Sequence, residues 1–135
     1  MKNILMIIFL GSALIFKAQT IESANHSLKG YIKDDGTVEN NKHTTKAFIK
    51  GDGVIEDAAH KIQGYLRSDG TVENANHAVI GYLKGDGTVE DASHTILGYL
   101  SSNGEAKNSS NAVIGYYKGV YMNWAGLVFF FFKVV

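Results

Sequence analysis

The sequence contains no cysteine and no proline, and its formal net charge is zero. Without cysteine the chain forms no disulfides, binds no metal through thiolates and carries no cysteine-linked lipid. Without proline, and with 15 glycines, it suits uninterrupted strands joined by tight turns. The balance of 13 basic and 13 acidic residues argues against a nucleic-acid partner and against a polybasic membrane patch.

The first 19 residues differ in composition from the rest of the chain. Lys2 precedes an apolar run from Ile4 to Phe16 that only Gly11 and Ser12 interrupt. A basic start followed by roughly 7–15 apolar residues is typical of a secretory signal peptide, and it is too short to span a membrane. We therefore expect residues 1–19 to be a signal peptide, with cleavage after residue 18 or 19. The protein should be exported: periplasmic, on the outer surface or secreted.

A 17-residue unit repeats through residues 20–118. Its two best copies are Gly64–Ile80, GYLRSDGTVENANHAVI, and Gly81–Leu97, GYLKGDGTVEDASHTIL. Looser copies occupy residues 30–46, 47–63 and 98–114. Self-similarity at a fixed short period predicts identical structural units, each of which buries its apolar face against its neighbours.

Each unit carries the strongest local signal for a β-hairpin, an Asp-Gly or Asn-Gly pair between β-branched and aromatic residues. The pairs begin at Asp35, Asp52, Asp69, Asp86 and Asn103. A two-residue loop would pair Ile32 with Glu39, whereas a three-residue loop pairs Ile32 with Val38 and Tyr31 with Glu39. Since a slip of one residue would turn every buried side chain outward, the sequence predicts the three-residue loop, with its glycine in the left-handed conformation.

A glycine lies between two apolar residues on the predicted core face of the longer strand in each unit. The positions are Gly30, Gly64, Gly81, Gly98 and Gly115, with Ala47 in the second copy. Glycine weakens a strand, so another group should approach closely there. We therefore predict an all-β fold: a closed ring of short antiparallel hairpins with the apolar face inward. The end segments Thr20–Glu22 and Gly115–Tyr117 should pair to close it.

Residues 119–135 form a separate apolar segment, GVYMNWAGLVFFFFKVV. The uninterrupted run from Ala125 to Phe132 is too short to cross a bilayer of roughly 30 Å. We expect residues 119–135 to plug one mouth of the ring; whether as a strand or a helix stays open. The alternative is a contact with a membrane or with another subunit.

Histidine recurs at one position of the repeat, three residues after an Asn or Asp, or after Ser23 in the N-terminal copy. The members are His26, His43, His60, His77 and His94, with Asn111 in the last copy. The series suggests a metal site or a pH switch. A metal site would need these side chains to converge, but neighbours in the series are separated by two strands, about 9–10 Å at roughly 4.8 Å per strand. We therefore predict turn residues that hydrogen-bond the Asn/Asp loop, and no metal site.

An aromatic residue recurs on the outward face of the longer strand. The series consists of Tyr31, Phe48, Tyr65, Tyr82, Tyr99 and Tyr116. Three of its tyrosines should face Glu39, Glu73 and Glu90 across the strands, beside a Lys or Arg. Aromatic faces flanked by hydrogen-bonding groups can stack on sugar rings, so the six aromatics are the candidate ligand-binding residues. Cross-strand packing that only stabilises the sheet is the alternative explanation.

The repeat [GA]-[YF]-[IL]-x-x-[DN]-G-x-x-E-[DN]-x-x-H, the leader and the Phe-rich tail together resemble the five-fold β-flower proteins, exported repeat proteins of Bacteroidetes. The resemblance covers about residues 20–132 and implies a symmetric β-ring with no established enzymatic role. It supplies no catalytic residues. One departure is that this chain has five Asp/Asn-Gly turns but six copies of each strand.

These observations favour a non-catalytic, structural or surface-associated protein of the cell envelope. A glycan- or small-ligand-binding module is the second possibility, and an enzyme is a distant third, because every His, Asp and Glu recurs in register whereas a catalytic site usually breaks symmetry. No cofactor is expected. A glycan is the one partner class that the sequence suggests, and no transmembrane segment should remain after signal removal.

Overall fold

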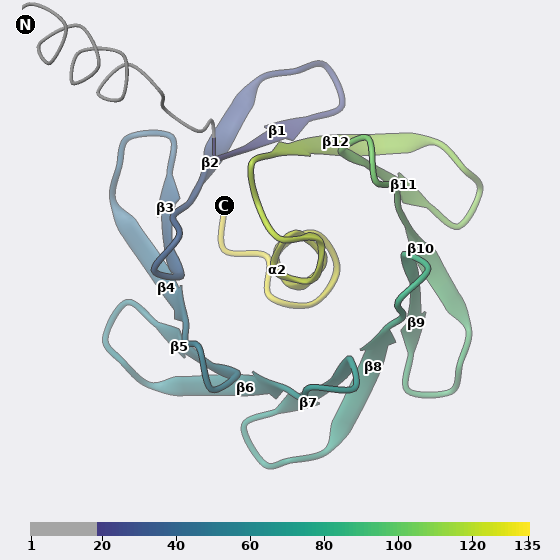
Figure 1. Cartoon of the computed structure of the whole chain (residues 1–135). Coiled ribbons are helices and arrows are strands. Elements are labelled where there is room, and N and C mark those ends of the chain that lie inside the picture. The colour runs from purple at the N-terminus through teal and green to yellow at the C-terminus, as the bar shows by residue number, and fades with distance from the viewer. Residues whose placement is uncertain (1–18) are drawn as a thin grey trace, which may run out of the picture.

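The computed structural model describes residues 19–135, which form a closed antiparallel ring of twelve short strands around a central helix (Figure 1). Apart from Gln19, the predicted signal peptide lies outside the described residues. The strands are β1 (Thr20–Ser23), β2 (Leu28–Ile32), β3 (Thr37–Asn40), β4 (Thr45–Ile49), β5 (Val54–Asp57), β6 (Ile62–Leu66), β7 (Thr71–Asn74), β8 (Val79–Leu83), β9 (Thr88–Asp91), β10 (Ile96–Leu100), β11 (Glu105–Asn108) and β12 (Val113–Lys118).

Six hairpins radiate from the ring like petals, beginning with β1–β2 and ending with β11–β12 (Figure 1). We number them petals 1 to 6. The Asn/Asp–His turns connect the two strands within a petal, and the Asp/Asn-Gly loops connect one petal to the next. Petals 6 and 1 have no covalent link and close the ring by pairing β1 with β12, Thr20 opposite Lys118 and Ser23 opposite Gly115. The predicted ring closure is therefore confirmed, with six petals.

The three-residue loop and its register are confirmed in every unit. Ile32 lies opposite Val38 and Tyr31 opposite Glu39. The equivalent apolar pairs are Ile49–Ile55, Leu66–Val72, Leu83–Val89 and Leu100–Ala106. The loop glycines have φ between +89° and +93°, which an L side chain rarely adopts. The Gly36 carbonyl also accepts a hydrogen bond of 2.8 Å from the Ile49 amide, so each loop fastens onto the next petal.

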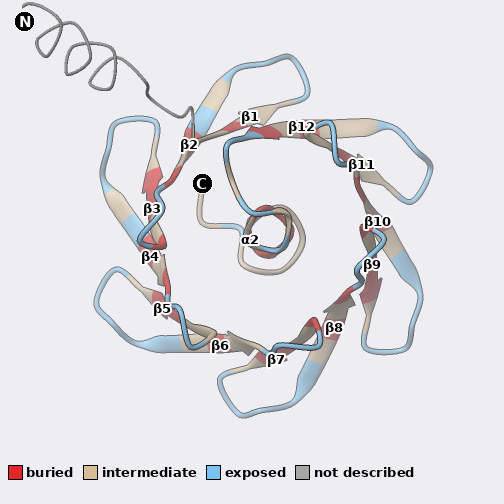
Figure 2. Cartoon of the chain, viewed as in Figure 1, coloured by how far each residue is buried: buried red, intermediate tan, exposed pale blue. Residues whose placement is uncertain are grey.

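A β-bulge near the start of each longer strand aligns the inner wall. In petal 4, Gly81 pairs with Val72 but Val79 pairs with Glu73, which leaves Ile80 as the extra residue. Ile80 packs against the core while Val79 remains exposed. The bulge therefore directs Ile80 to the same side as Gly81, and the buried residues line the inside of the ring while the petal tips are exposed (Figure 2).

The tail is helical and lies in the centre of the ring, as the prediction of a plug required (Figure 1). It consists of α2 (Met122–Gly126) and a π-helical turn, η1 (Leu127–Phe131). Gly126 packs so closely against Leu83 and Leu100 that a methyl group there would lie 2.6 Å and 2.9 Å from their Cδ atoms. Neither helix in residues 19–135 is long and apolar enough to cross a membrane.

The close approach predicted at the core glycines comes from the phenyl rings of the tail. A methyl group added at Gly81 would lie 2.4 Å from Cε1 of Phe131 and 2.4 Å from the Glu90 carbonyl oxygen. The pairs, one for each of four successive petals, are Phe129–Gly115, Phe130–Gly98, Phe131–Gly81 and Phe132–Gly64. At Gly30 in petal 1, Val135 takes the place of a phenyl ring.

We expect deletion of residues 120–135 to give an unfolded or aggregating product, even with every repeat intact. Burial of one Phe side chain contributes roughly 1.5–3 kcal/mol, so four of them, even half-buried, approach the total stability of a small domain. Thermal unfolding and light scattering would measure the effect. Lys133→Gln is the control, because Lys133 is an exposed residue of the same tail and its replacement should leave stability nearly unchanged. A truncated chain as stable and soluble as the original would contradict the plug.

Candidate functional site

The predicted site residues belong to a repeated cluster of four side chains at each junction between petals. At the junction of petals 3 and 4, the imidazole of His77 stacks on Tyr65 with ring centroids 4.2 Å apart. His77 Nδ1 lies 2.9 Å from Glu73 Oε1, and Arg67 Nε donates to Glu73 Oε2 at 2.5 Å. Tyr65 and Arg67 flank the end of petal 3, whereas Glu73 and His77 belong to petal 4. We call this cluster the clasp, because it joins neighbouring petals.

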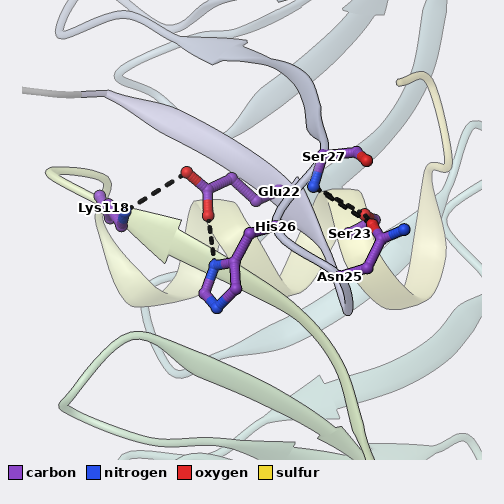
Figure 3. Close-up of polar contacts among 6 residues, drawn as sticks. All are labelled: Glu22, Ser23, Asn25, His26, Ser27 and Lys118. Atoms are coloured by element: carbon purple, nitrogen blue, oxygen red, sulfur yellow. Dashed lines mark hydrogen bonds and ion pairs between the residues drawn. The ribbon is translucent and has the colours of Figure 1, made fainter.

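Five of the six junctions contain a complete clasp. The stacked ring centroids are 3.9–4.5 Å apart and the His Nδ1–Glu Oε1 distances are 2.8–2.9 Å. The other four clasps are Tyr31–His43–Glu39–Lys33, Phe48–His60–Glu56–Lys50, Tyr82–His94–Glu90–Lys84 and Tyr116–His26–Glu22–Lys118. The last of these holds the two ends of the ring together: Glu22 on β1 contacts both His26 and Lys118 (Figure 3).

The turn chemistry places each histidine. In petal 4 the Asn74 side chain accepts hydrogen bonds from the Asn76 and Ala78 amides, and the His77 amide donates to the Asn74 carbonyl at 3.0 Å. His77 has φ +64°, in the left-handed region that histidine enters more readily than most residues. The predicted turn role is confirmed for the backbone. The imidazole, however, bonds to the glutamate four residues earlier and not to the loop, which the sequence analysis missed.

The charge of the clasp glutamates is stabilised by their neighbours. Glu39, Glu56, Glu73 and Glu90 are only 5–8% exposed. For Glu39, Glu56 and Glu90 the hydrogen bond to histidine is the main cause that holds the pKa below its ordinary value, and burial opposes it. For Glu73 the hydrogen bond from Arg67 lowers the pKa most. These carboxylates therefore stay ionised at neutral pH, with both oxygens engaged.

The junction between petals 5 and 6 differs from the others. Tyr99 is present, but Lys107 stands opposite it where the other junctions have glutamate, and Asn111 stands where they have histidine. Glutamate and histidine are thus lost from the same copy, and elsewhere they are always four residues apart. This joint loss was the signal in the sequence that could have revealed the clasp.

The predicted outward aromatics lie as expected but are not brought together. Tyr31, Tyr65 and Tyr82 face Glu39, Glu73 and Glu90 across the strands. All six are half-buried, and they are distributed around the ring, one to a petal. In five of them one ring face is covered by imidazole.

A hollow of about 500 Å³ at the clasp of petals 3 and 4 is lined by Asp52, Tyr65, Leu66, Arg67, Ser68, Asp69, Glu73 and His77.

The histidines do not converge on a common point. Each Nδ1 is occupied by its own glutamate, as with His43 and Glu39 at 2.9 Å. Within residues 19–135, no three His, Asp or Glu side chains are grouped so that they could hold a metal ion. The clasp therefore offers a polar, aromatic surface at each junction, built from hydrogen bonds among its own members.

Comparison with known proteins gives one result. A model of the family described as 5-fold beta-flower protein matches residues 18–133. No curated protein matches the chain, and no solved structure does. The matched segment includes the six petals, the clasps and most of the plug.

We expect the protein to lose stability as the pH falls below about 4.5, the ordinary pKa of glutamate. The folded state has the lower pKa, so the unfolded state binds more protons between the two values, and the free energy of unfolding decreases as the pH falls through that window. Above it the contribution is fully present. Urea unfolding between pH 7 and pH 3 would measure the slope, which Glu56→Gln with Glu90→Gln should reduce.

The junction between petals 5 and 6 provides the opposite test. Lys107→Glu with Asn111→His would introduce the missing pair, so this variant should be more stable at pH 7 and should lose more stability on acidification. Equal acid dependence in the original chain and in both double variants would contradict the role of the clasps.

Proposed function

Because this chain belongs to the 5-fold beta-flower protein family, we propose that it is a non-catalytic repeat protein of the cell envelope with a structural or surface-associated role. The basic and apolar pattern of residues 1–19 supports export. The clasp is the observation that supports a non-catalytic role. At five junctions its glutamate and histidine pair in the same geometry and join neighbouring petals.

A general base or nucleophile needs a free position toward a substrate. In the clasp at Glu73, one carboxylate oxygen bonds to His77 and the other to Arg67. The side chains with acid–base chemistry therefore stabilise the ring, and their repetition favours a rigid scaffold.

Export can be tested by fractionating cells that express the full chain. We expect a product shortened by 18 or 19 residues outside the cytoplasm, because the apolar run is of signal-peptide length. The same chain without residues 1–18 is the control, and it should remain in the cytoplasm as a folded protein. Recovery of the full-length chain, unprocessed, from the cytoplasm would contradict the proposal.

A second candidate function, glycan or small-ligand binding, is favoured by the junction between petals 5 and 6. Tyr99 has Asn111 beside it in place of histidine, so no imidazole covers its ring face. The nearby Lys107 pairs with Glu105 at 3.5 Å and supplies hydrogen-bonding groups at the edge of the ring. A sugar ring that stacks on an aromatic face needs this combination.

We expect that any sugar bound by residues 19–135 in a glycan panel is bound more weakly by Tyr99→Ala. Tyr82→Ala is the matched control, because its ring is already stacked on His94 at 4.5 Å. Loss of one aromatic stack should weaken binding about tenfold, the equivalent of about 1.4 kcal/mol. Isothermal titration calorimetry would measure the affinity. Equal losses in the two variants would assign binding to the whole series of aromatics, and no binding to any glycan would leave the structural role alone.

A further inference from the structure

The two ends of the ring differ in chemistry. At one end, which we call the Asp–Gly end, lie the loops that connect the petals. At the other, the Asn–His end, lie the turns within the petals. The plug enters at the Asp–Gly end, where Gly126 contacts Leu83 and Leu100 just before their loops. Its phenyl rings lie further along, at the level of the core glycines and toward the Asn–His end.

The Asn–His end has an apolar centre that is only partly covered. Phe129 to Phe132, Val134 and Val135 are all half-buried and not fully covered. Ile80, Leu97 and Ile114, at the rim of petals 4 to 6, are also half-buried and pack against the same core. Val79 and Ile96 adjoin the rim and are 39% and 40% exposed. The centre and the rim of petals 4 to 6 are thus apolar, and Val79 and Ile96 lie on the outer face of the same strands, opposite Glu73 and Glu90.

The other half of the same rim is basic. The positions equivalent to Ile80 are occupied by Lys29 in petal 1 and Lys46 in petal 2, and both are exposed. Lys133 of the tail is exposed as well, and it lines the same hollow of about 270 Å³ as Lys29, together with Ile114 and Phe129. Further lysines, Lys42 and Lys61, lie in the turns of petals 2 and 3. Basic and apolar groups therefore adjoin directly.

Acidic groups are concentrated at the opposite end. Asp34, Asp35, Asp52, Asp69 and Asp86 lie exposed in the Asp–Gly loops. Within residues 19–135, the turns of the Asn–His end contain two carboxylates, Asp57 and Asp91. The basic residues beside these loops pair with the clasp glutamates, so the loop aspartates give the Asp–Gly end its negative charge. The lysines named above give the Asn–His end its positive charge.

We propose that the Asn–His end docks onto the surface of an anionic lipid bilayer. The Phe-rich centre would enter the interface between headgroups and acyl chains, and Lys29, Lys46 and Lys133 would contact lipid phosphates. Apolar side chains beside lysines whose heads reach the headgroups are the pattern of interfacial binding. In this arrangement the ring lies on the membrane surface.

A second copy of the chain fits this surface less well. Two Asn–His ends placed face to face would bring lysine rims of like charge together. An Asn–His end placed on the Asp–Gly end of another ring would pair charges at the rim but would press the apolar centre against polar loops. An anionic bilayer offers lipid phosphates and an apolar interior at adjacent depths, which matches lysines beside a Phe-rich centre.

The test uses residues 19–135, which close into a complete ring, so that the apolar leader does not contribute. Vesicles of phosphatidylcholine alone and of phosphatidylcholine with an equal share of phosphatidylglycerol are mixed with the protein and sedimented. We expect binding to the anionic vesicles that weakens with added salt. Lys29→Gln with Lys46→Gln should weaken it roughly 25-fold, since each lysine near an anionic surface contributes about 1 kcal/mol.

Two controls address charge and depth. Lys33→Gln with Lys84→Gln removes the same charge near the Asp–Gly end, and it also removes one member from each of two clasps. Thermal unfolding therefore checks that this variant is folded, and the folded variant should bind vesicles as the original chain does. Val79→Ser with Ile96→Ser removes exposed apolar groups at little cost to folding and should weaken binding. Trp124 lies at the Asp–Gly end, beside Gly51 and Asp52, so bromine-labelled lipids should not quench its fluorescence. A tryptophan substituted at Val79 in a Trp124→Phe background should be quenched.

The proposal rests on the envelope location proposed above only for its biological setting, because vesicle binding is measured without export. Absence of binding to anionic vesicles by a folded ring overturns the docking proposal but not the export proposal. Retention of the full chain in the cytoplasm overturns the export proposal but not the docking proposal. A dimer in analytical ultracentrifugation that Val79→Ser with Ile96→Ser abolishes, without vesicle binding, would assign the surface to a second copy.

Discussion

The space inside the ring at the level of the core glycines determines the rest of the structure. At four petals this space is filled by a phenyl ring, and a methyl group at any of these glycines would come within 2.8 Å of a ring carbon. Six petals divide the circle into steps of about 60°, whereas an α-helix turns about 100° per residue. A π-helix turns less per residue, because its hydrogen bonds reach one residue further. The π-helical turn from Leu127 to Phe131 thus lets consecutive phenylalanines face consecutive petals.

The clasps solve a second problem, the stability of the petals. A two-stranded hairpin is marginal in water by itself, and each petal extends away from the plug. The clasp connects the turn of one petal to the strand of the preceding one, as His77 does with Tyr65. The junction where the chain ends meet retains a complete clasp, Tyr116 with His26 and Glu22 with Lys118. The incomplete one is between petals 5 and 6, where the backbone already connects the petals through Gly104. Side-chain pairing is thus complete where covalent continuity is missing.

The fold could be predicted from the sequence because the same pattern of apolar, glycine and turn residues recurs in five copies. The loop register followed from the need to keep Ile32 opposite Val38, and the close approach followed from glycines on a core face. The helical form of the tail could not be predicted, since a Phe-rich run is equally compatible with a strand and depends here on the geometry of the ring. The clasp was missed because the Asn-x-x-His spacing was explained by turn chemistry alone. The backbone part of that explanation holds, but the left-handed φ of the histidine also brings its imidazole to the glutamate.

The symmetry of this ring is broken at one set of positions, the rim of the Asn–His end. The core glycines, the loop glycines and five clasps repeat with little change, which is what a closed ring requires of every petal. The rim of the Asn–His end is different: Lys29, Lys46 and Gln63 occupy it in petals 1 to 3, and Ile80, Leu97 and Ile114 in petals 4 to 6. Ring closure places no demand on these positions, since charged and aliphatic residues are both accommodated there. The difference between petals 1 to 3 and petals 4 to 6 is therefore a property of the surface and not of the fold. It makes the Asn–His end the part of a nearly symmetric ring where one half differs chemically from the other.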